Sequence, residues 1–133
     1  MIQSAPPGIV ATTSPANTKT FDWGTISWLF TGESAPGAEQ TLGYVVIQPG
    51  QKNPLHAHPN CEEVLYLLSG ELEHSLDGAV YRLKPGDAIR VPAGAKHDAR
   101  NVTDQPAAMV VCYSDPARQM VDYETPAGQA PRE

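Results

Sequence analysis

The sequence predicts a single all-β domain, built as a sandwich or barrel of short strands. A chain of 133 residues supports one core, because a domain of this length buries roughly two-thirds of the surface exposed by the unfolded chain. Its 13 prolines and 11 glycines favour frequent turns over long helices. Eight short runs of β-type residues lie between turn sequences. The predicted strands are 25–30, 42–48, 64–68, 71–76, 80–83, 88–91, 97–102 and 108–113.

The turn sequences between these runs have specific chemistry. Asp77 and Gly78 separate two predicted strands and match a type I′ hairpin turn, in which both central residues need positive φ. Proline and glycine in residues 84–87 and 91–94 supply further turns. The only helix-like candidate, 116–121, is too short to be stable alone. We therefore expect short strands joined by tight turns.

The two ends of the chain lack a sustained strand pattern. Residues 1–20 are rich in Ser, Thr, Pro, Ala and Asn, and the last eighteen residues are rich in proline and alanine. The expected division is a flexible or interface-forming N-terminal arm over 1–20, a β-barrel domain over 21–115 and a C-terminal tail over 116–133.

Charge and hydropathy limit the possible partners. A net charge of −6, with no run of basic residues, disfavours binding to nucleic acid. No apolar stretch approaches the ~20 residues that span a bilayer, and residues 1–15 do not resemble a signal peptide. We therefore expect a cytoplasmic protein without a membrane partner. Cys61 and Cys112 are expected to be reduced thiols.

Histidines and a glutamate form a candidate metal site. His56 and His58 are spaced i and i+2, which on a strand directs both imidazoles to one face, about 7 Å apart. Glu63 follows after a short loop, and His97 follows a turn much later in the chain. Three neutral imidazoles and a carboxylate suit Fe(II), Mn(II), Ni(II), Cu(II) or Zn(II).

The spacing of these residues is more specific than their type. The first motif runs from Gly50 through His56, His58 and Glu63 to Gly70, with five, one, four and six intervening residues. The second motif runs from Gly86, with five residues before Pro92 and one before Gly94. His97 follows after two residues and Asn101 after three.

The two motifs, in this order, resemble those of the cupin superfamily, and the likeness covers about residues 42–113. Within that superfamily, the sequence resembles the small, single-domain members. This resemblance implies a double-stranded β-helix of the jelly-roll type. It also implies one divalent transition metal ion per chain, bound by His56, His58, Glu63 and His97. The glycines and prolines would form turns, and Asn101 would have a structural role beside the ligands.

Glu62 is an alternative carboxylate ligand, because a shorter gap after His58 also fits the looser family pattern. Glu63 is preferred because only Glu63 leaves six residues before Gly70. It also alternates with Leu65 and Leu67 on one strand face.

Three other polar residues have less specific signals. For His74, a packed or interface role is favoured over substrate binding. Arg90 is expected to be solvated or at an interface rather than directed at a carboxylate substrate. Cys61 is expected to be a buried, inert thiol, although its loop lies between ligands.

Four protein ligands leave up to two positions open on a six-coordinate ion, which favours an enzyme. The first hypothesis is a dioxygenase for a metal-bound enolic, catecholic or dicarbonyl substrate, with Glu63 as the catalytic base. An isomerase, lyase or decarboxylase is the alternative, and so is a non-catalytic module that binds a small molecule. A homodimer is expected, because edge strands and sheet faces need protection.

Overall fold

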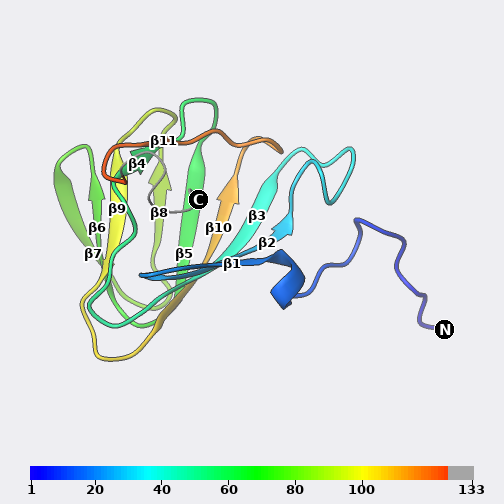
Figure 1. Ribbon diagram of the computed structural model, residues 1–133, viewed down its shortest axis with the longest axis horizontal. Helices are drawn as coiled ribbons and strands as arrows, with labels where there is room; N and C mark the ends of the chain where they lie inside the picture. Colours follow the sequence, from blue (N-terminus) through cyan, green and yellow to red (C-terminus); the bar gives the residue numbers. More distant parts are fainter. Residues whose placement is uncertain (126–133) are drawn as a thin grey trace.

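The structure is a computed structural model that describes residues 1–125, in which two antiparallel sheets form the body of the domain (Figure 1). One sheet has the strand order β1-β2-β3-β10-β5-β8 and the other β11-β4-β9-β6-β7. The strands are β1 (Thr18–Phe21), β2 (Gly24–Phe30), β3 (Thr41–Ile47), β4 (His56–Ala57), β5 (Glu63–Ser69), β6 (Leu72–Leu76), β7 (Ala79–Leu83), β8 (Ala88–Val91), β9 (His97–Asn101), β10 (Ala107–Tyr113) and β11 (Val121–Asp122).

Alternation along the strands explains how the core forms. In β3 and β10, every second residue is buried and the intervening ones are partly exposed, as expected when one face of a sheet covers a core. A single cluster joins the inner faces of both sheets, with Ile47 and Leu67 from one and Leu72 from the other all fully buried. The described part of the chain is thus a jelly-roll barrel, as the sequence predicts.

All eight predicted strands are present, and their ends differ from the prediction by at most one residue. The Asp77–Gly78 turn is also confirmed, with φ of 48° and 89°. Gly70 ends the first motif at φ 80°, where a Cβ atom would lie 2.8 Å from Ala107. Glycine is therefore required there for both conformation and space.

The sheets extend beyond the strands that the sequence predicts. β1 begins inside the segment expected as an N-terminal arm, directly after a 3₁₀ helix, Pro15–Asn17. It pairs with β2, so the end of that segment belongs to the sheet. The first residues run away from the sheets (Figure 1). β4 and β11 pair with each other, so the beginning of the expected C-terminal tail lies against the first motif. Residues 126–133 of that tail lie outside the described part of the chain.

The helix-like candidate 116–121 is not helical. Its backbone carbonyls accept hydrogen bonds from other parts of the chain instead. The Gly32 amide donates to the Pro116 carbonyl at 2.8 Å, and Asn60 Nδ2 donates to the Ala117 carbonyl at 3.0 Å. In residues 1–125, no helix has the length and apolar character needed to cross a membrane.

Candidate metal centre

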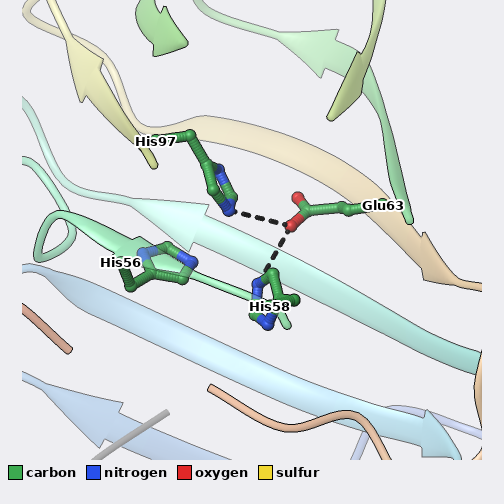
Figure 2. Close-up of side chains that lie close together, drawn as sticks. All are labelled: His56, His58, Glu63 and His97. Carbon is green, nitrogen blue, oxygen red and sulfur yellow. Dashed lines mark ion pairs between the residues drawn. The ribbon is translucent and has the colours of Figure 1, made fainter. Parts of the chain in front are cut away.

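Four side chains from distant parts of the sequence meet between the two sheets. His56 lies on β4, His58 directly follows that strand, and Glu63 and His97 begin β5 and β9 (Figure 2). One potential ligand atom of each residue lies within 4.8 Å of the others. None of the four is more than 3% exposed, so the site is in the interior.

Strand pairing explains why His56 and His97 meet. The two residues are direct partners in the antiparallel pairing of β4 with β9. Their ring centroids are 4.2 Å apart, and His58 lies 4.9 Å from His56 and 5.3 Å from His97. The i, i+2 spacing thus brings the first two imidazoles to the third, as the sequence predicts.

Backbone carbonyls determine the tautomers of the first two histidines. His56 Nδ1 lies 2.6 Å from the Pro54 carbonyl, and His58 Nδ1 lies 2.9 Å from the Gln119 carbonyl. A carbonyl only accepts hydrogen bonds, so each neutral ring carries its proton on Nδ1 and donates it there. Each Nε2 is then the unprotonated nitrogen, which is the form that binds a metal ion.

Several atoms of the cluster have no hydrogen-bond partner among the described residues. Three buried atoms lack such a partner: His58 Nε2, His97 Nε2 and Glu63 Oε1. Figure 2 shows the carboxylate between the two rings, with Oε1 at 3.3 Å from His58 Nε2 and 3.5 Å from His97 Nε2. Each unsatisfied buried polar group costs about 1–3 kcal/mol. One divalent cation would satisfy all three atoms.

Electrostatics also favours a cation. Burial raises the pKa of Glu63, but the contact with His58 and the positive charge that His97 carries when protonated outweigh this effect, so the pKa falls to about 2. Burial lowers the pKa of His97 to about 3. At neutral pH the site therefore combines a buried carboxylate with a neutral imidazole. Its donor set, three imidazoles and one carboxylate, fits a divalent transition metal ion.

The structure distinguishes the two candidate carboxylates. Glu63 points into the barrel, whereas the Glu62 side chain is 42% exposed and pairs with Arg90 on the outer surface. Arg90 is 63% exposed, so the expectation of a solvated arginine is confirmed. Asn101 is fully buried and donates through Nδ2 to the Ile47 and Gln105 carbonyls, which confirms its structural role.

The two thiols are free. Cys61 is buried, and burial raises its pKa to about 11, so the thiol is protonated at neutral pH and is a poor metal ligand. The expectation of an inert thiol agrees with this environment.

His74 lies closer to the site than its sequence pattern suggested. It is 1% exposed and lines one small cavity together with His56, Glu63 and His97. Apolar side chains complete much of the wall, including Val45, Leu65, Ala99, Met109 and Val111. The cavity has about 10 Å³ for the centre of a water molecule, enough for about one water. The available signal in the sequence was the spacing of His74 two residues after the apolar Leu72, which places both side chains on one face of β6.

A C-terminal strap, residues 114–125, was not anticipated as part of the site. The Gln119 carbonyl holds His58, and the Gln119 amide donates to Asn60 Oδ1 at 2.8 Å. The Ser114 amide donates to the Glu62 carbonyl at 3.0 Å, and the Tyr123 amide donates to the Leu55 carbonyl at 2.9 Å. These bonds join the strap to the chain on both sides of His58, at Leu55 before it and at Asn60 and Glu62 after it. They use mainly backbone atoms, so the sequence carries little trace of them.

The fold and site define a class: a jelly-roll barrel with an interior three-histidine, one-carboxylate metal centre. Comparison with protein families agrees with that class. Residues 43–113 match the family model described as the cupin domain, and the chain therefore belongs to the cupin family.

Three known proteins illustrate the similarity. Polyketide synthase CurC of Streptomyces cyaneus is 32% identical over 108 residues, which cover 78% of this chain and 70% of CurC. Quercetin 2,3-dioxygenase of Bacillus subtilis is 43% identical over 51 residues, or 38% of this chain and 15% of that protein. The crystal structure of Lactobacillus farciminis oxalate decarboxylase superposes with a TM-score of 0.73 at 23% identity. The match covers 79% of this chain and 32% of the decarboxylase, and it supports the fold alone.

Proposed function

We propose that this cupin is a metal-dependent dioxygenase for a small enolic, catecholic or dicarbonyl molecule. The observation that carries the proposal is the buried cluster of four ligands, because an ion that accepts six donors keeps up to two positions for other molecules. The similarity to a quercetin 2,3-dioxygenase supports a dioxygenase reaction.

The protein residues have separate roles in this proposal. His56, His58, Glu63 and His97 hold the ion, which supplies Lewis acidity and, when it is redox-active, electron transfer. Glu63 is also the catalytic base and accepts the proton of a substrate hydroxyl on a carboxylate oxygen. Its low pKa keeps it ionised at neutral pH, the form that binds a cation. The mostly apolar cavity wall leaves room for no more than about one water molecule in the same space.

The size of the cavity constrains how a substrate binds. With room for about one water molecule, it admits a larger molecule only if lining side chains move. We therefore expect only the chelating atoms of the substrate to enter, while its remaining bulk lies outside.

Metal substitution combined with oxygen uptake tests the reaction type. The Fe(II), Mn(II), Ni(II) or Cu(II) form should consume dioxygen only when an enolic or catecholic compound is present. The Zn(II) form should be inactive, because zinc has no accessible redox change. Full turnover with zinc would point instead to an isomerase, lyase or decarboxylase. Tight binding of a compound without turnover by any metal form would favour the non-catalytic binding module.

The quaternary state and location are further parts of the proposal. The outer face of the larger sheet presents Val64, Tyr66 and Leu68 at 42–48% exposure. Apolar side chains on three successive positions of this face support a homodimer formed through the sheet. The N-terminal arm would be a second contact between the two chains. A solution mass of about 14.3 kDa by light scattering, that of a single chain, would contradict the dimer.

The cellular location is a separate part of the proposal. The two free thiols support a cytoplasmic location.

A further inference from the structure

His74 occupies an unusual position for a histidine that serves packing alone. Its side chain is 1% exposed, and its Nδ1 is buried without a hydrogen-bond partner in the described residues. The adjacent cavity wall is mostly apolar, with Leu65, Met109 and Val111 close to the site. A leucine or phenylalanine at position 74 would pack there without leaving a polar atom unsatisfied. Within residues 1–125 this polar atom therefore remains available to a molecule that enters the cavity.

The geometry separates His74 from the metal ligands. It is not one of the four residues whose ligand atoms cluster within 4.8 Å. Its ring instead stacks on His97, with centroids 5.4 Å apart and an angle of 15° between the planes. His74 faces Ala99 on β9, two residues after the ligand His97, and both residues line the cavity. The histidine is thus fixed beside the ligand cluster on a paired central strand.

We propose that His74 is the hydrogen-bonding residue for the exogenous ligand of this site, a water molecule, a small anion or the oxygen end of a chelating substrate. The cavity that it shares with three ligands has room for about one water molecule, so any molecule that enters is in its reach. A neutral imidazole serves an anionic ligand by carrying its proton on Nδ1 and donating it. The inference deepens the proposed function by assigning a residue to ligand positioning, and it rests on the same metal centre.

Azide binding to the full chain loaded with Co(II) tests the assignment without measuring turnover. Elemental analysis first establishes the cobalt content, and the visible absorption of cobalt then reports azide affinity. In His74→Phe, which retains a planar ring against His97, cobalt content should be unchanged and the azide Kd should rise about 10- to 100-fold. This is the range expected for loss of one hydrogen bond to a charged group.

Two matched variants distinguish hydrogen bonding from packing. In His74→Asn, the side-chain amide lies near the place of the imidazole Nδ1 and can donate, so azide affinity should recover to within about threefold of the native value. Met109→Leu changes another cavity-lining residue at nearly constant volume and should alter the azide Kd by less than about twofold.

Three results would overturn the assignment of His74: an unchanged azide Kd in His74→Phe, loss of cobalt from that variant, or equally weak azide binding in His74→Phe and His74→Asn. A native chain that binds no metal would overturn both this assignment and the proposed function. A native chain that binds cobalt and azide normally, but turns over no substrate, would contradict the proposed function only.

Discussion

We expect His56→Ala and His97→Ala each to lower the metal affinity of the chain by more than about 100-fold. Loss of a residue that only orients a ligand already costs about 10- to 100-fold in affinity, and these substitutions remove the ligand itself. His56 and His97 are direct partners across β4 and β9, so each substitution removes one donor from the centre of the cluster. Elemental analysis after dialysis against a metal buffer measures the result.

His74→Ala is the matched control, because it removes a buried imidazole outside the ligand cluster. It should retain about one ion per chain. Full occupancy in both ligand variants would show that the metal is held elsewhere. Circular dichroism of each variant without metal confirms that the barrel is still folded.

Glu63→Gln should lower turnover by about 10²- to 10⁴-fold, the usual contribution of a positioned acid or base. The substitution preserves side-chain volume but removes the buried negative charge, so metal affinity should also fall. Glu62→Gln should change both quantities by less than about twofold. Glu62 lies outside the barrel and pairs with exposed Arg90, a type of contact that contributes about 0–1 kcal/mol.

Steady-state kinetics and metal analysis of the two purified variants provide the comparison. Because the residues are adjacent in sequence, general effects of a glutamine at this turn would appear in both. Equal losses, or a larger loss in Glu62→Gln, would mean that the site uses the other carboxylate and that the assigned strand register is wrong.

The strands that could be predicted are those with local signals. Asp77–Gly78 defines a hairpin by its own conformational preference, and β3 and β10 are short runs rich in apolar and β-branched residues. β4 and β11 each contain two residues, too few to show any periodicity. β1 has no buried residues, so hydrophobic pattern gives it no signal.

The same distinction applies to the site. The ligands could be predicted because four residues at specific spacings match a family pattern, and the structure places all four together. The cavity role of His74 depends on its distance from His97, which lies 23 residues later and on another strand. The contribution of Gln119 is harder to predict, because its contact with His58 uses a backbone carbonyl.

Because His58 contacts the backbone carbonyl of Gln119, the strap must place a carbonyl at this point, which constrains the number of residues in the strap. The side chain at position 119 is not constrained by this contact. Any amino acid supplies the oxygen that fixes the His58 tautomer, so substitutions at this position leave the hydrogen bond available. An insertion or deletion between Asp115 and Gln119 would shift a different carbonyl towards the ring. It would also break the paired bonds of Asn60 with Ala117 and Gln119. In this part of the chain, changes in length should therefore alter metal binding far more than changes in composition.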